Sequence, residues 1–153
     1  MPTITYEIYI EAPIAICFDL ARNVDVHTET TAKTKERAVA GVTSGLMEKG
    51  DSVTWEATHL GVRQKLTAQI MVMEKPYSFT DCMVKGAFHS FVHTHEFVEK
   101  GSGTIMRDRF VYRSPLGILG KLADRLFLEN YMNKFIAERA IALKKIAEKP
   151  RME

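Results

Sequence analysis

Residues 120–149, GKLADRLFLENYMNKFIAERAIALKKIAEK, form one continuous pattern in which apolar residues recur every three or four positions. This spacing is that of one side of an α-helix. The apolar side is formed by Leu128, Met132, Phe135, Ile136, Leu143 and Ile146, and the opposite side by Lys134, Glu138, Lys145 and Glu148. The stretch therefore predicts a long C-terminal helix whose apolar side covers another part of the molecule.

Arg139 interrupts the apolar side of this predicted helix. A guanidinium group that faces a covered surface needs an anionic or carbonyl partner, because it loses its hydration there. We predict that Arg139 is largely buried and reaches an inward carboxylate, Asp108 first and Asp81 second. The alternative is that a bound ligand supplies the partner.

Length and composition indicate one core. The chain has 153 residues, of which 46% are hydrophobic, enough for one well-filled domain. We expect residues 1–149 to form this domain and residues 150–153 to form a tail. The net charge of +2 is not gathered into blocks, which argues against a nucleic-acid partner. Cys17 and Cys82 lack metal-type spacing, and we interpret both as reduced, small apolar residues.

The N-terminal residues alternate like a strand instead of forming a basic start followed by an apolar run. No uncharged run reaches the length of about 18 residues that indicates a transmembrane helix. We therefore expect a cytoplasmic protein without membrane insertion.

Turn signals divide the rest of the chain into strands. Thr3 to Glu11 alternate, Pro13 opens a short helix that ends at Asn23 and Asp25, and His27 to Lys35 predict an irregular helix or loop. Further strands are predicted near Glu36 to Val42 and over Asp51 to Leu60, Arg63 to Glu74, Tyr77 to Val84, Phe88 to Glu99 and Thr104 to Arg113. Ser114 to Gly117 break the last strand. The predicted fold class is α+β, with seven antiparallel strands, the second to seventh in sequence order and the first beside the seventh.

Several short motifs occur in this order along nearly the whole chain. They are Glu36 to Gly41, Trp55 with His59-Leu60-Gly61, Gly86-Ala87-Phe88, His93 to Phe97, Gly103-Thr104, Asp108-Arg109 and Ser114 to Gly117. With them the sequence resembles the START-like (SRPBCC) superfamily, and within it the bacterial polyketide cyclase/dehydrase-like branch. The resemblance implies the helix-grip fold, a curved seven-stranded sheet wrapped on a long C-terminal helix, with two short helices after the first strand and a cavity between helix and sheet. It implies no reaction, because function resides in the site.

Strand alternation predicts which polar side chains share the covered face. His59 shares the face of Trp55, His93 and His95 share that of Phe91, and Asp108 shares that of Phe110. By the same argument Asp81 is predicted to face inward, because it lies between Phe79 and Met83 on one face of its strand. We expect these groups to lie near Arg139.

Three alternatives remain open for this polar set. It could be structural, with buried groups that satisfy one another. It could orient a small hydrophobic or amphipathic molecule in a cavity. The residues predicted to contact such a ligand are Trp55, His59, Met71, Met83, Phe91, His93, His95, Asp108, Phe110, Phe135 and Arg139.

The third alternative is catalytic. His93 or His95 with Asp108 could act as a general acid/base in a cyclase or dehydratase on a polyketide-like or aromatic substrate. His93 and His95 could instead bind zinc together with His59 and Asp108, but the H-x-H spacing is a weak signal and we expect no metal and no other cofactor. We adopt the ligand cavity as the main interpretation. An interaction module would follow if side chains filled the cavity, and the sequence leaves open whether the chain forms a homodimer.

Overall fold

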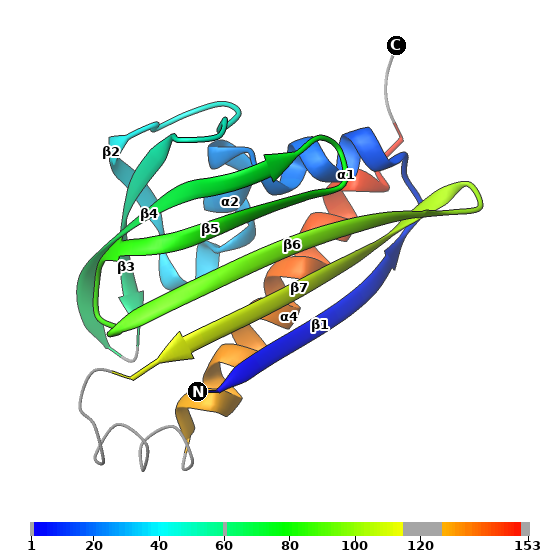
Figure 1. Ribbon diagram of the computed structural model, residues 1–153. Coiled ribbons are helices and arrows are strands. Elements are labelled where there is room, and N and C mark those ends of the chain that lie inside the picture. Colours follow the sequence, from blue (N-terminus) through cyan, green and yellow to red (C-terminus); the bar gives the residue numbers. More distant parts are fainter. Residues whose placement is uncertain (1, 60, 115–126, 151–153) are drawn as a thin grey trace.

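A computed structural model describes residues 2–59, 61–114 and 127–150 (Figure 1). The strands are β1 (Thr3–Ile10), β2 (Arg37–Gly41), β3 (Ser52–His59), β4 (Val62–Glu74), β5 (Ser78–Lys85), β6 (Ser90–Lys100) and β7 (Gly103–Arg113). The helices are α1 (Ile14–Ala21), α2 (Val24–Thr30), the short 3₁₀ helix η1 (Ala32–Thr34) and α4 (Glu129–Ala147).

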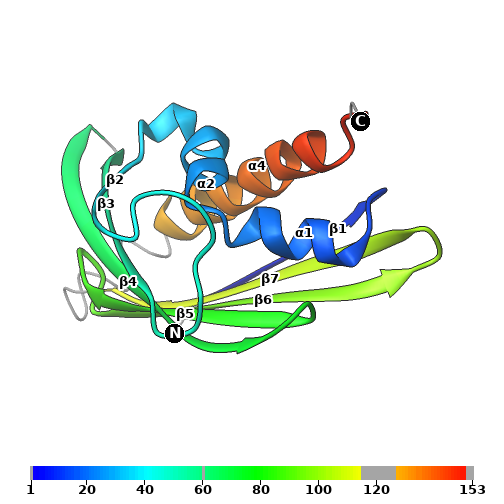
Figure 2. The same ribbon diagram turned by 90° about the horizontal axis from the view of Figure 1, so that it is seen from above.

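The strands form one antiparallel sheet with the order β1-β7-β6-β5-β4-β3-β2. This order confirms the predicted meander and the pairing of the first strand beside the seventh. The sheet is strongly curved, and α1, α2 and α4 all lie on its concave side (Figure 2). The described chain thus has the predicted α+β, helix-grip architecture.

Asn23 separates the two helices that follow β1. Its side-chain Oδ1 accepts hydrogen bonds from the backbone amides of Asp25 and Val26, which caps the start of α2. The region predicted as an irregular helix or loop contains the end of α2 and η1, and the strand predicted nearby is β2. α1 and α2 therefore meet at Asn23, beside the concave face.

One side of α4 is buried, as the spacing of its apolar residues predicted. Met132, Ile136, Ala140, Leu143 and Ala147 are its buried residues. The predicted beginning of this helix at residues 120–126, residues 115–117 of the predicted strand break and Leu60 in a predicted turn lie outside the described residues. None of the described helices is long and apolar enough to span a membrane.

A bulge in β4 changes which side chains face inward. The register with β5 shifts between Ile70 and Val72, so the strand gains a residue there. Ile70 is buried, Met71 is 49% exposed, and Met73 packs again on the core. The prediction that Met71 contacts a ligand in the cavity was wrong, because strict alternation does not hold across a bulge.

Candidate functional site

A cavity of about 320 Å³ lies between the sheet and α4. Its apolar wall is formed by Trp55, Ala57, Leu66, Ala68, Ala87, Phe88, Phe91, Phe110, Leu128, Met132, Phe135 and Ile136. Polar side chains enter it from the sheet, from α2, from the segment before β2 and from α4, and they are His27, Glu36, His59, Gln64, Asp81, His93, Tyr131 and Arg139. The wall is thus mainly apolar, with polar groups at a few places.

The structure brings most of the predicted site residues to this cavity. Trp55, His59, Phe91, His93, Phe110, Phe135 and Arg139 line it. Met83 packs against the apolar cluster that contains Phe91 and Phe110, but it does not itself line the cavity. His95 lines a smaller pocket beside this cavity, Asp108 is buried and bonded to His93, and Met71 is exposed on the other face of the sheet.

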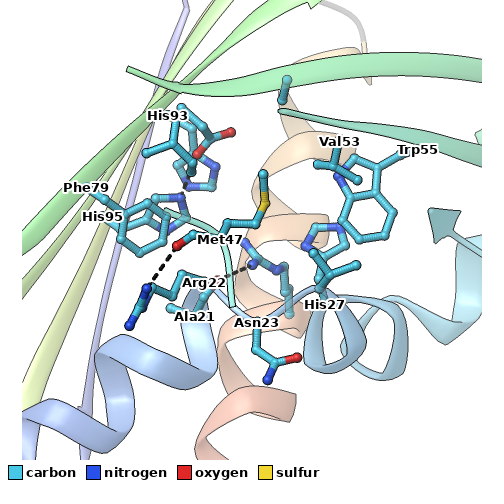
Figure 3. Close-up of a pocket in the computed structure, with 15 residues that line it drawn as sticks. Ala21, Arg22, Asn23, His27, Met47, Val53, Trp55, Phe79, His93 and His95 are labelled. Atoms are coloured by element: carbon cyan, nitrogen blue, oxygen red, sulfur yellow. Dashed lines mark hydrogen bonds and ion pairs between the residues drawn. The ribbon is translucent and has the colours of Figure 1, made fainter. Parts of the chain in front are cut away.

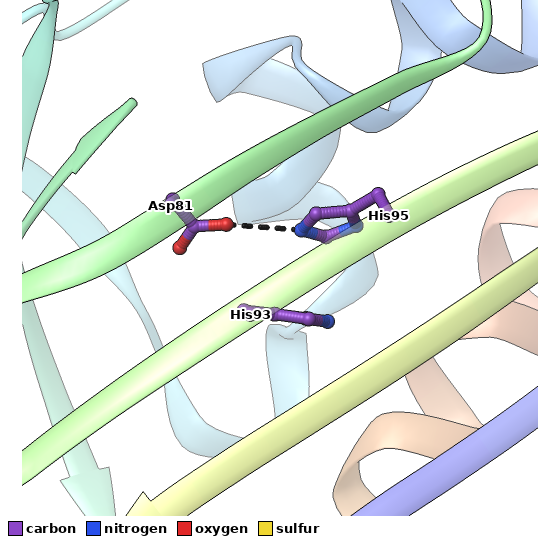
Figure 4. Close-up of side chains that lie close together, drawn as sticks. All are labelled: Asp81, His93 and His95. Atoms are coloured by element: carbon purple, nitrogen blue, oxygen red, sulfur yellow. Dashed lines mark hydrogen bonds and ion pairs between the residues drawn. The ribbon is translucent and has the colours of Figure 1, made fainter. Parts of the chain in front are cut away.

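A buried cluster of two histidines and two aspartates lies on β5, β6 and β7. Asp81 is opposite His93 in the sheet, and His95 is opposite Asp108. His95 bonds to both carboxylates, with Nε2 3.0 Å from Asp81 Oδ1 and Nδ1 3.0 Å from Asp108 Oδ1. Figure 4 shows the contact with Asp81 and the position of His93 beside it. His93 Nε2 lies 3.0 Å from the same oxygen of Asp108, so one carboxylate oxygen holds both rings.

The hydrogen bonds give the two imidazoles opposite protonation tendencies. Burial works to lower the pKa of His95, but the hydrogen bonds to Asp108 and Asp81 outweigh it and raise this pKa. Burial and the neighbouring His95 lower the pKa of His93. The ring centroids are only 3.8 Å apart, so a proton on His95 disfavours one on His93. Burial works against charge on Asp108, yet the two imidazoles hold its pKa well below the usual range.

Arg139 corrects a second prediction. It is half-buried, and within the described part of the chain its hydrogen bond goes to the backbone: Nη2 donates to the carbonyl of Ala21, the last residue of α1, at 3.4 Å. Neither Asp108 nor Asp81 pairs with it among the described residues, because the histidines occupy these carboxylates. The Nε atom of Arg139 is buried and has no hydrogen-bond partner in the described part of the chain.

A second polar group lies at the cavity, and of its members only His59 was predicted from the sequence. Glu36 is only 8% exposed, and its carboxylate contacts His27 Nε2 at 2.9 Å and Thr34 Oγ1 at 2.8 Å. His59 Nδ1 lies 2.6 Å from the hydroxyl of Tyr131 on α4. Helical spacing could have predicted that His27 faces inward, since it follows the buried Val24 by three residues on α2.

A smaller pocket of about 70 Å³ adjoins the main cavity and shares His27, Trp55, Asp81, His93 and Arg139 with it. In Figure 3, His93 and His95 lie on one side, Trp55 and His27 on the other, and Met47 between them. The junction of α1 and α2 thus closes one end of the space under the helices.

Asp81, His93 and His95 are the described residues whose arrangement could hold a metal ion, with one ligand atom from each within 4.8 Å of the others. Both nitrogens of His95 already contact carboxylates, so a metal would have to displace one of these contacts. His59 is bonded to Tyr131 instead, and the predicted alternative set of His59, His93, His95 and Asp108 is not brought together. The absence of a bound metal stays a prediction.

Comparisons with known proteins bear on the fold. No protein-family model and no curated protein matches the sequence. Among solved structures, protein TTHA0849 from Thermus thermophilus is similar with a TM-score of 0.78 and 19% identity, over 94% of this chain and 95% of that one. Major latex-like protein 151 from Panax ginseng is similar with a TM-score of 0.71 and 15% identity, over 97% and 98% of the two chains. The KanY protein is similar with a TM-score of 0.72 and 16% identity, also over 97% and 98%.

The chain has the START-like fold. The resemblance seen in the sequence is therefore confirmed at the level of the fold. In this START-like fold the cavity lies under α4, and β3 to β7 supply its floor. Placement in the polyketide cyclase/dehydrase-like branch stays a prediction.

Proposed function

We propose that this chain binds one small hydrophobic or amphipathic molecule in the cavity under α4. The observation that carries the proposal is the cavity of about 320 Å³, whose wall is mainly apolar and aromatic with polar groups at few places. Ligand sites in proteins have this composition, because apolar walls bury the body of the ligand and isolated polar groups orient it.

Arg139 supports an amphipathic ligand with an oxygen acceptor. Its buried Nε has no partner among the described residues, and a buried donor left in this way is costly. Arg139 lines the cavity, so a carboxylate, enolate or phenolate there would accept from its guanidinium group and would also neutralise the charge. The guanidinium therefore marks one polar end of the proposed ligand.

The alternative is a cyclase or dehydratase acting on a polyketide-like or aromatic substrate. His93 favours it, because this residue lines the cavity while its Nε2 bonds to Asp108. With a proton on Nε2, the neutral ring has an unprotonated Nδ1 that could accept a proton beside a substrate carbonyl. His95 would then hold Asp108 in place without touching the substrate. Turnover of a polyketide-like substrate that His93→Gln abolishes, with ligand affinity preserved, would favour the enzyme.

Titration with an amphipathic anion, 8-anilinonaphthalene-1-sulfonate, tests the binding proposal. Trp55 is the one tryptophan of the sequence and lines the cavity, so energy transfer from Trp55 reports occupancy of this site. We expect saturable binding of one probe per chain. Arg139→Met should weaken it about tenfold or more, because a charged hydrogen bond is lost. The empty variant should unfold with a free energy within about 1 kcal/mol of the parent, since among the described residues the guanidinium makes one long hydrogen bond, to a backbone carbonyl.

Arg109→Met is the matched control, because Arg109 is exposed on β7. This variant should bind the probe like the parent. The proposal would be overturned by non-saturable binding, or by equal loss of affinity in the two arginine variants.

A further inference from the structure

In the second polar group at the cavity, the contacts favour one donor and one acceptor for each hydrogen bond. The inference drawn from this group rests on the proposed binding function. The group contains Glu36, His59 and Tyr131, which come from the segment before β2, from β3 and from α4. His59 Nδ1 lies 2.6 Å from the Tyr131 hydroxyl, and His59 Nε2 lies 4.0 Å from Glu36 Oε2. His59 thus stands between a carboxylate and a phenol.

Glu36 is the fixed negative end of this group. Burial works to raise its pKa, but the hydrogen bond from His27, with that from Thr34 and the nearby imidazoles, holds the pKa below its ordinary value. Its carboxylate is therefore ionised near neutral pH and only accepts hydrogen bonds. His27 and Thr34 donate to it at 2.9 Å and 2.8 Å.

The carboxylate sets the tautomer of His59. Burial lowers the pKa of His59 despite the opposing charge of Glu36, so the ring is neutral and carries one proton. The negative charge of Glu36, with Oε2 4.0 Å from Nε2, favours the tautomer that carries its proton on Nε2. Nδ1 is then an acceptor, and it accepts a hydrogen bond from the Tyr131 hydroxyl at 2.6 Å.

Tyr131 has no second proton to offer. Burial raises the pKa of Tyr131, with support from the charges of Glu36 and Glu138, so its hydroxyl stays protonated. That single proton is directed to His59, and the oxygen lone pairs are what Tyr131 presents to the cavity that it lines. A ligand group beside Tyr131 must therefore donate a hydrogen bond.

We propose that Tyr131 is an acceptor-only contact that selects ligands carrying a hydroxyl or N–H group at this end of the cavity and disfavours carbonyl and ether oxygens there. Arg139 lies eight residues further along α4, a rise of about 12 Å, and presents only donors. The cavity thus recognises a molecule with a hydrogen-bond donor toward Tyr131 and an oxygen acceptor toward Arg139.

Two probes test this inference, 1-naphthol and its methyl ether 1-methoxynaphthalene, in which a methyl group replaces the hydroxyl proton. Affinities are measured by calorimetry at pH 7, where naphthol is protonated, with Trp55 emission as the reporter of the site. The parent should prefer naphthol about tenfold, because an ether beside Tyr131 leaves two acceptors facing each other. Tyr131→Phe should bind both probes with affinities within about twofold of each other. Tyr77→Phe, the same change at a residue that is 59% exposed, should keep the parent's preference.

His59→Phe distinguishes the directed hydrogen bond from a merely structural role. It frees the Tyr131 proton to turn toward the ligand, so the preference for naphthol should shrink although Tyr131 is intact. Equal affinity of the two probes for the parent would overturn this inference and leave the proposed binding function in place. If neither probe binds or changes Trp55 emission, both this inference and the proposed binding function are overturned. Should Tyr131→Phe not fold, as judged by circular dichroism, the parent and His59→Phe decide the question.

Discussion

At the scale of residues, alternation along a strand predicted which polar side chains face inward, but not which groups they contact. His93, His95 and Asp108 point inward as predicted, because the face of a side chain follows from its position along a regular strand. The partner of Arg139 could not be predicted in this way. Two carboxylates were available in the sequence, but the choice depends on distances between strands, and the histidines lie nearer to both. A backbone carbonyl such as that of Ala21 cannot be identified from the sequence as a hydrogen-bond partner, because every residue has one.

A proton NMR titration of the histidines tests the described cluster. His95 should titrate above its ordinary value of about 6.5, because two carboxylates hold its protonated form, and His93 should titrate below it. Because the folded pKa of His95 is raised, its contribution to the free energy of unfolding is fully present below about pH 6.5 and is lost as the pH rises through the folded pKa.

Asp81→Asn should lower the pKa of His95, since it removes one of the two carboxylates that contact this ring. Glu96→Gln is the control, because Glu96 adjoins His95 on β6 and points to the other face of the sheet. A His95 pKa below that of His93, or one that responds equally to both substitutions, would contradict the described hydrogen bonds.

At the scale of elements, helical periodicity identified α1 and α4, and turn signals together with strand-forming residues identified most of the strands. The stretch that contains the end of α2 and η1 was predicted only as an irregular helix or loop. The terminal helix was found from the spacing of Met132, Ile136 and Leu143, all of which are buried. Periodicity failed at the bulge in β4, where an added residue turns Met71 outward while Met73 stays inward. No local signal in the sequence announces such a bulge.

Paired substitutions in β4 test the position of this bulge. Met73→Ala should lower the free energy of unfolding by about 1 to 2 kcal/mol, because a partly buried side chain loses its contacts with the core. Met71→Ala should change it by less than about 0.5 kcal/mol, as expected for an exposed position. Urea unfolding measures both values. If Met71→Ala were the more destabilising, the register of β4 against β5 would be wrong.

At the scale of the whole molecule, evenly spaced turns predicted the order of the sheet, and the terminal helix predicted what covers it. The cavity came from the resemblance to START-like proteins, and its polar lining was predicted only in part. His59 and His93 were found because they lie on regular strands, whereas Glu36 and Tyr131 come from a segment between elements and from the edge of the apolar side of α4. Such positions depend on how the layers pack, which periodicity does not encode.

Native mass spectrometry of the chain purified from its source organism tests the binding claim most directly. The parent should carry one small organic molecule per chain, released on denaturation. Ala57→Phe should carry none, because Ala57 is 5% exposed and lines the cavity, so a phenyl group there occupies the ligand's space. Its fold is checked by circular dichroism. A parent whose native mass equals that of the bare chain, and which takes up no added amphipathic probe, would contradict the account.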